Sequence, residues 1–314
     1  MLIANPIYDS VFKYLLEDNA LAKLLLSIII GEEIVELDFL PQEYIASGIS
    51  PRSLTVYRFD FAAMVKNSKG EFRQVLIEIQ KAKLDTDIMR FRRYLGSQYS
   101  DPKNVKIEPV YNKKGKKVRT RKKAIPLLTI YFLWYSLEYT KAPIIRVQRE
   151  CQDLTTGEKI AKKEPFIESL THDSYVIQIP HLRHNRRTEI EKMLQVFDQE
   201  RIYVDQNGNM DRHQLEINEK AIPECYRPIL RRLQRAIANK ELLKSMDIED
   251  EILEELQNRE REAEYERTEK EKAEKRAEIA EELAMKAEEL AAKERIKNER
   301  LLALLKQFGI EPFK

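Results

Sequence analysis

The chain has few of the residues that anchor a disulfide scaffold or a structural zinc site. Its 314 residues include only Cys151 and Cys225, no C-x-x-C spacing, and four histidines. This composition argues against a small disulfide-stabilised fold and against a zinc finger, and a reducing cytosol is the compartment that fits it.

Long apolar runs are also missing. The longest, residues 124–137, is too short to cross a bilayer and predicts a buried strand. The first residues lack the basic region and clean apolar stretch of a signal peptide. We therefore expect a protein without a membrane partner.

Charge is abundant, at 34% of residues, and it is divided unevenly. Residues 247–300 hold 12 basic and 20 acidic side chains, a balance of −8, and the other residues hold 43 and 33, a balance of +10. A basic globular part favours polyanionic partners such as nucleic acid.

The acidic segment has neither glycine nor proline from residue 248 to Gly309, and it predicts one long helix with i,i+4 charge pairs. Its apolar positions keep heptad spacing for only a few turns. A weak coiled coil that joins copies of the chain and a solvated single helix are both open.

Three parts are expected: a core at 1–140, an extension of short strands and helices at 141–246, and the long helix at 247–314. In the core, helical spacing predicts two helices that break near Asp18-Asn19 and end at Gly31. The segments expected after them are strands at 34–40, 55–65, 72–79 and 125–135 with a helix at 85–99, then strands at 144–150, 158–162 and 173–179, and helices at 189–198 and 224–239.

The strands at 55–65 and 72–79 flank an Asn-Ser-Lys-Gly turn and predict a β-hairpin. Because side chains alternate along a strand, Asp60 lies on the face opposite to that of Phe59 and Phe61. Glu78 and Gln80 share one face of their strand. Two neighbouring buried carboxylates need a compensating cation, and a hard divalent ion supplies one. From the spacing alone, the alternative that Asp60 and Glu78 lie on a solvated face of the sheet is equally open.

Asp60, the hairpin turn with Gly70, and Glu78-Ile79-Gln80 together resemble the PD-(D/E)xK nuclease superfamily, and more narrowly its recombination-promoting, transposase-like nucleases. Further features of residues 5–137 agree with the resemblance. They are Asp9-Ser10-Val11-Phe12-Lys13, the helix with Arg90, Tyr94 and Gln98-Tyr99, and the strand after Ile125-Pro126.

The resemblance implies an αβββαβ core of the restriction-endonuclease type, with a small mixed sheet between helices. It also implies DNA cleavage with Mg²⁺, Mn²⁺ or Ca²⁺, in which Asp60 and Glu78 bind the metal and both act with Gln80 in catalysis. Gln80 stands where most of the superfamily has lysine, and an amide cannot serve as a general base. The accessory candidates are Asp9, Lys81, Arg90, Tyr94 and Gln98.

Residues 103–123 contain ten basic side chains against Glu108 alone, a balance of +9. Such a loop or ribbon suits binding to a phosphate backbone, although a flexible solvated loop has the same composition. The DNA-binding candidates are Lys113, Lys114, Lys116, Lys117, Arg119, Arg121, Lys122 and Lys123. Two functions follow as hypotheses: a metal-dependent DNA endonuclease, or an inactive nuclease-like protein that binds DNA and assembles through its last helix.

Overall fold

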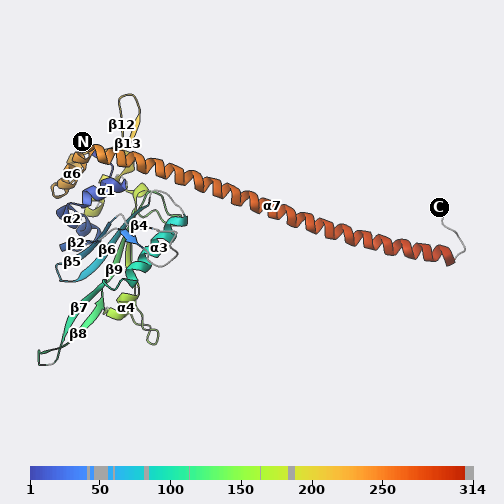
Figure 1. Cartoon of the computed structure of the whole chain (residues 1–314), viewed down its shortest axis with the longest axis horizontal. Helices are drawn as coiled ribbons and strands as arrows, with labels where there is room; N and C mark the ends of the chain where they lie inside the picture. The colour runs from blue at the N-terminus through green and yellow to red at the C-terminus, as the bar shows by residue number, and fades with distance from the viewer. Residues whose placement is uncertain are drawn as a thin grey trace. The chain divides into compact units, whose positions relative to one another are not determined.

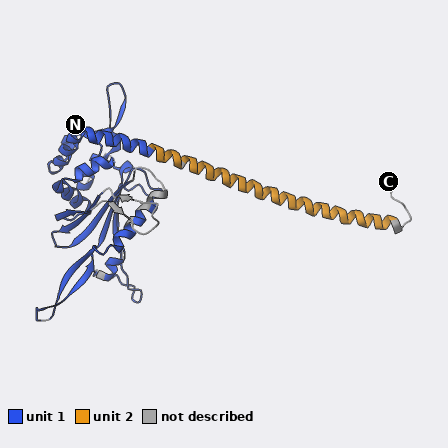
Figure 2. Ribbon diagram, viewed as in Figure 1, with its two compact units in different colours: residues 1–253 blue, residues 254–314 orange. Residues whose placement is uncertain are grey.

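The computed structural model describes residues 1–40, 43–45, 56–58, 61–80, 85–112, 114–162, 164–182 and 188–307. Contacts between residues divide the chain into two compact units, Met1–Leu253 and Glu254–Lys314 (Figure 2). All of the strands lie in the first unit.

Two amphipathic helices open the first unit as predicted: α1 (Asp9–Leu16) and α2 (Asn19–Ile30). The side chain of Asp18 accepts hydrogen bonds from the backbone N–H groups of Ala20 and Leu21, which makes it the N-cap of α2. Gly31, with φ +74°, ends that helix in the left-handed conformation that glycine adopts without strain.

A six-stranded mixed sheet forms the centre of this unit, in the order β10-β11-β9-β6-β5-β2 (Figure 1). β5 and β6 make the predicted hairpin, and β6, β9 and β11 run parallel. The helix α3 (Asp85–Ser100) follows β6 and leads into the basic segment. The strand bounds are β2 (Ile34–Phe39), β5 (Phe61–Asn67), β6 (Phe72–Gln80), β9 (Leu127–Leu133), β10 (Ile144–Val147) and β11 (Asp173–Gln178). The expected mixed α/β class and the central place of the most apolar strand are confirmed.

Helices cover both faces of the sheet (Figure 1). On one face α1 and α2 enclose the main core, where the Phe12 ring lies 5.7 Å from that of Phe132. On the other face α3 covers a small cluster of Ala62, Leu76 and Phe91.

The predicted strand at 55–65 is present in its described residues, as two strands with different partners. Residues 59 and 60 lie outside the described part, β5 begins at Phe61, and Val56–Arg58 forms a separate strand, β4. β4 pairs with β3 (Glu43–Ile45) in a two-stranded sheet of its own. A continuous alternation of residues cannot reveal that its two halves have different partners.

Residues 141–182 add the strands β10 and β11 and the short helix α4 (Pro165–Leu170). The predicted strand at 158–162 is wrong: only an isolated bridge between Gln152 and Lys159 forms there. The described side chains of that segment are exposed, so it has no apolar face to bury.

A three-stranded sheet that the sequence did not reveal joins the two ends of this unit, in the order β1-β13-β12. Leu2 pairs with Glu216, so its register rests on pairs more than 200 residues apart. Its strands and the neighbouring helices are β1 (Leu2–Ala4), β12 (Ile202–Val204), β13 (Met210–Glu216), α5 (Glu189–Leu194) and α6 (Arg227–Ile237), with short 3-10 turns at Ile179–His181, Gln195–Phe197, Gln199–Arg201, Glu219–Ala221 and Glu224–Tyr226.

The last helix, α7, runs from Lys240 to Gln307 and confirms the long helix, which begins earlier than expected. Pairs such as Lys286 with Glu282 and Lys293 with Glu289, both at 2.6 Å, connect successive turns. In the described part of the chain, none of the helices combines the length and apolar character of a membrane span.

Candidate active site

Glu78 lies on β6 and is 1% exposed, which makes it one of the most deeply buried charged residues of the sheet. Even-numbered residues of β6 face α3, because Gln74 contacts Gln98 of that helix and Leu76 belongs to its cluster. The odd-numbered Val75, Ile77 and Ile79 lie in the main core. Glu78 therefore points toward α3 from a strand whose other face is apolar from Val75 to Ile79.

The neighbour of Glu78 across the sheet is Tyr131 of β9, which pairs with it in parallel register. The Tyr131 ring packs against Phe91 of α3, with centroids 4.6 Å apart. Burial, and then the nearby charge of Glu78, raise the pKa of the Tyr131 hydroxyl well above its ordinary value. Tyr131 thus stays a neutral hydroxyl beside the carboxylate at any physiological pH.

The other members of the predicted triad are only partly described. Gln80 is the last residue of β6, two positions beyond Glu78 on the same strand. Its side chain, and the whole of Asp60 and Lys81, lie outside the described residues. The same holds for the side chains of Arg90 and Tyr94 on α3. Their roles remain predictions.

Gln98 is placed by its hydrogen bonds at the beginning of β6. Its Oε1 accepts a hydrogen bond from Gln74 Nε2 at 2.5 Å, and its backbone oxygen accepts one from Asn104 Nδ2 at 2.6 Å. Gln74 precedes Glu78 by four residues, or about 13 Å along a strand. These contacts attach the end of α3 to the sheet and leave Gln98 beside Gln74.

Asp9 opens α1, on the face of the sheet opposite to α3. Its backbone N–H and that of Ser10 donate hydrogen bonds to the carboxylate of Glu249, at 2.8 and 2.9 Å. The structure therefore places Asp9 at the start of a capped helix. Its role near a metal ion remains a prediction.

The basic segment forms a two-stranded antiparallel ribbon, β7 (Val105–Tyr111) and β8 (Lys117–Ala124). Lys114 and Lys116 lie in its turn, where both backbone N–H groups bind Asn112 Oδ1, and Lys113 is outside the described residues. The remaining DNA-binding candidates lie on β8. The ribbon that the composition suggested is thus present.

The base of the ribbon lies at the opposite end of β6 from Glu78. The Lys106 ammonium lies 4.4 Å from the centre of the Phe72 ring, and Phe72 is the first residue of β6. Six residues of strand, about 20 Å, separate Phe72 from Glu78. The ribbon is therefore close to Glu78 in the sequence, but its base lies at the other end of β6.

A cleft of about 340 Å³ opens between the ribbon base, the start of β9 and α4. Its cations are Arg73, Lys106, Lys123 and Arg149, and its carboxylates are Glu71, Glu108, Glu168 and Asp173. Arg149 is paired with Glu168 and with Asp173, each at 3.1 Å. The cleft is nearly balanced in charge and lies away from Glu78.

A divalent ion is the cofactor that the resemblance implies, and Glu78 fits part of its coordination. Mg²⁺ is commonly held by one or two carboxylates with water and substrate phosphate as further ligands. Over the ranges that the structure describes, no group of three or more His, Cys, Asp or Glu side chains could hold a metal. The described residues thus offer one carboxylate, and the second ligand would be Asp60.

Comparison of the chain with models of protein families, with curated proteins and with solved structures gives no match.

Proposed function

We propose that this chain is a metal-dependent nuclease that hydrolyses DNA, with Asp60 and Glu78 as metal ligands and Gln80 beside them. The observation that supports it is the burial of Glu78 on the α3 face of β6. A carboxylate taken out of water costs several kcal/mol unless a positive or hydrogen-bonding group compensates it. Proteins retain such a group where a function requires it.

The residues of this site have distinct tasks in the proposal. A bound divalent ion would supply the positive charge that activates water and stabilises the leaving oxygen of a phosphodiester. Glu78 is held in one direction by its strand and by the packing of Leu76 and Tyr131 around α3. The amide of Gln80 can orient water or a phosphate oxygen by hydrogen bonds, without adding charge.

Nicking of supercoiled plasmid in Mg²⁺ or Mn²⁺ tests the proposal. We expect Asp60→Asn and Glu78→Gln each to lower the rate by about 100-fold or more, since even indirect partners of a metal contribute 10- to 100-fold. Glu36→Gln is the matched control, because Glu36 lies on β2 of the same sheet with a 57% exposed side chain. Circular dichroism confirms that each variant is folded, and equal nicking by a folded Glu78→Gln protein would overturn the assignment.

A second function is favoured by one observation, the position of the ribbon about 20 Å from Glu78 along β6. A protein of this fold could bind DNA through the ribbon without cutting it, with Gln80 in place of a catalytic lysine. Salt-sensitive DNA binding by a wild-type protein that shows no metal-dependent nicking would establish this alternative.

A further inference from the structure

The two faces of the ribbon differ in chemistry. Alternation along β8 puts Arg119, Arg121 and Lys123 on one face and Thr120 and Lys122 on the other, and a register shift follows beyond Arg119, toward the turn. Cross-strand register adds Lys106, Glu108 and Val110 to the first face, which we call the cationic face. Lys106, Glu108 and Lys123 also line the cleft, so this face is turned toward α4.

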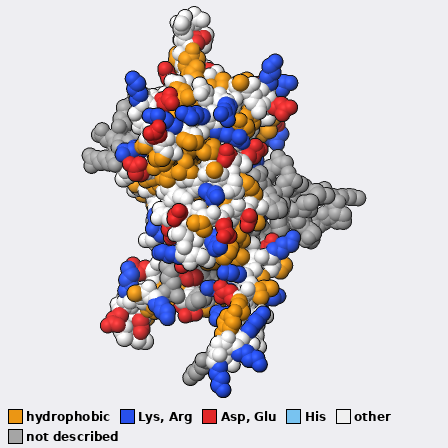
Figure 3. Space-filling model, turned by 90° about the vertical axis from the view of Figure 1, so that its left-hand side faces the viewer, with side chains coloured by type: hydrophobic (Ala, Val, Ile, Leu, Met, Phe, Trp, Pro, Cys, Tyr) orange, Lys and Arg blue, Asp and Glu red, His pale blue; other side chains and the backbone are white. Residues whose placement is uncertain are grey.

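The cationic face holds four cations and one carboxylate. The opposite face holds Lys122 and, past the register shift after Val110, Lys117 opposite Tyr111, beside the exposed Ile107. Composition alone gave the segment its charge, and the register of the strands now places both of its arginines on one side. Figure 3 shows Lys and Arg side chains gathered at the lower end of the ribbon.

Among the described residues of this face, Glu108 is the one carboxylate beside four cations, and it stands opposite Arg121 in the register. Arg119, Arg121 and Lys123 form no ion pair with any described carboxylate, and Lys106 lies 3.9 Å from Glu108, at the limit of such a pair. Lys106 and Lys123 stand directly opposite each other. Like charges at this position destabilise a strand pair, and an anion placed between them would remove that cost.

The cleft below does not compensate this charge. Its carboxylates Glu168 and Asp173 are already paired with Arg149, and Glu71 lies 3.3 Å from Arg73. The surplus of positive charge therefore begins at Lys123 and continues along the ribbon toward its turn.

The geometry points to the cationic face of the β7–β8 ribbon as a one-sided binding surface for the phosphate backbone of duplex DNA. The inference deepens the proposed function, on which it rests for the choice of substrate. A seven-pair ribbon extends over about 20 Å, the length of about six base pairs. Arginine and lysine on phosphates give affinity without base recognition, so the binding is independent of sequence.

An anionic membrane is the competing partner, because the ribbon has exposed apolar side chains. The exposed Ile107 lies on the face opposite to the arginines, however. A flat bilayer that covered Ile107 would meet Lys117 and Lys122 and leave Arg119 and Arg121 turned toward the cleft side. The arrangement therefore favours a rod-shaped polyanion along the cationic face.

Fluorescence anisotropy of a labelled 30-base-pair duplex tests the inference, with the full chain in EDTA over a range of salt concentrations. Each phosphate contact contributes about 0.9 to the slope of log K against log salt. We expect Arg119→Gln with Arg121→Gln to lower that slope by about two and to weaken binding more than 10-fold at low salt. Lys122→Gln is the matched control on the same strand: the register moves this DNA-binding candidate to the other face, so its substitution should leave the slope unchanged.

The outcomes separate the two proposals. Because EDTA prevents metal-dependent cleavage, this assay measures binding alone, and its outcome does not depend on whether Glu78 proves to be catalytic. Equal losses in the Arg121→Gln and Lys122→Gln proteins would overturn the one-sided surface. Binding to phosphatidylserine vesicles without binding to the duplex would overturn the choice of partner.

Discussion

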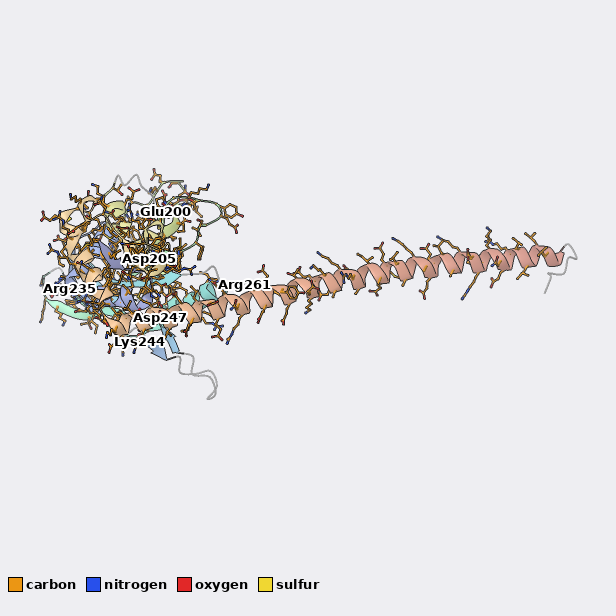
Figure 4. The ribbon with its side chains drawn as sticks, turned by 90° about the horizontal axis from the view of Figure 1, so that it is seen from above. Glu200, Asp205, Arg235, Lys244, Asp247 and Arg261 are labelled. Atoms are coloured by element: carbon orange, nitrogen blue, oxygen red, sulfur yellow. The ribbon has the colours of Figure 1, made fainter. Side chains whose placement is uncertain are left out.

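The carboxylate of Glu249 accepts a hydrogen bond from the backbone N–H of Asp9 at 2.8 Å, so a residue of α7 caps α1 from 240 positions away. Its other oxygen accepts the N–H of Ser10. The neighbouring Asp250 accepts a hydrogen bond from the Tyr8 hydroxyl at 2.9 Å and lies 3.0 Å from His213 Nε2. Asp247 lies on an early turn of α7 (Figure 4), and its carboxylate is 3.9 Å from the other ring nitrogen of His213.

Glu249→Ala should lower the free energy of unfolding by about 1 kcal/mol, because it removes the acceptor for two N-terminal N–H groups of α1 and a negative charge from the positive end of that helix. Urea unfolding measures the change. Glu251→Ala, two residues further along α7 and exposed, is the control and should stay within about 0.5 kcal/mol of the wild type. Equal effects of the two substitutions would contradict the cap.

Arg149 is the connection between α4 and the start of β11. Its guanidinium donates to the carbonyl oxygens of Ile167, Glu168 and Thr171 and pairs with Glu168 and Asp173. Arg149→Met should cost about 2 kcal/mol, since it leaves two carboxylates together without their cation. Arg149→Lys should recover less than half of that in urea unfolding, because an ammonium cannot reach the same acceptors. Full recovery by lysine would show that charge alone matters.

His172 should make stability depend on pH on the acid side. Burial, and then the charge of Arg149, lower the pKa of His172 below its ordinary value of about 6.5, and its Nδ1 lies 2.7 Å from the Tyr99 hydroxyl. The unfolded chain then binds a proton before the folded one does. The contribution is complete above about pH 6.5 and is lost as the pH falls through the folded pKa.

Unfolding free energies between pH 5 and 7.5 measure this loss. His172→Gln should flatten the profile over that range. Tyr99→Phe removes the same hydrogen bond but leaves the titrating imidazole, so it should lower stability with an unchanged slope. A His172→Gln profile as steep as that of the wild type would assign the pH dependence to other groups.

Truncation of α7 should separate its anchored beginning from the rest. Met246 is fully buried, and Glu249 and Asp250 bind residues 8–10, so a chain ending at residue 253 should melt within a few degrees of the full chain. A chain ending at residue 245 loses all three side chains and should be less stable by about 3 kcal/mol, or roughly 10 °C in Tm. Differential scanning calorimetry compares both truncated chains with the full chain. Light scattering on the full chain and on the chain ending at residue 253 shows whether residues 254–314 set the oligomeric state.

The sequence correctly predicted the elements whose ends are set by interactions between residues that are close in the chain. Asp18 and Gly31 delimit α2 through a cap and a left-handed residue, and the turn before Gly70 closes the β5–β6 hairpin. The alternation of β6 correctly placed Glu78 on the face opposite to Ile79, but it left open whether that face is buried or solvated.

The sequence did not predict which segments that are distant in the chain contact each other. Nothing in Leu2–Ala4 indicates that it pairs with residues 214–216, and nothing in Glu249 indicates that it caps α1. Composition gave the charge of the ribbon, whereas the division of that charge between two faces required its register. The distance of the ribbon from Glu78 likewise depends on how α3 returns the chain to the start of β6, which no local pattern encodes.

The most direct test of the nuclease assignment is a crystal soaked in Mn²⁺ and measured at a wavelength where manganese scatters anomalously. The account predicts an anomalous peak about 2.2 Å from a carboxylate oxygen of Glu78, on the α3 face of β6, that disappears in the Glu78→Gln protein. A peak elsewhere with none at Glu78, or a peak at Glu78 unchanged in the variant, would contradict the assignment of Glu78 as a metal ligand.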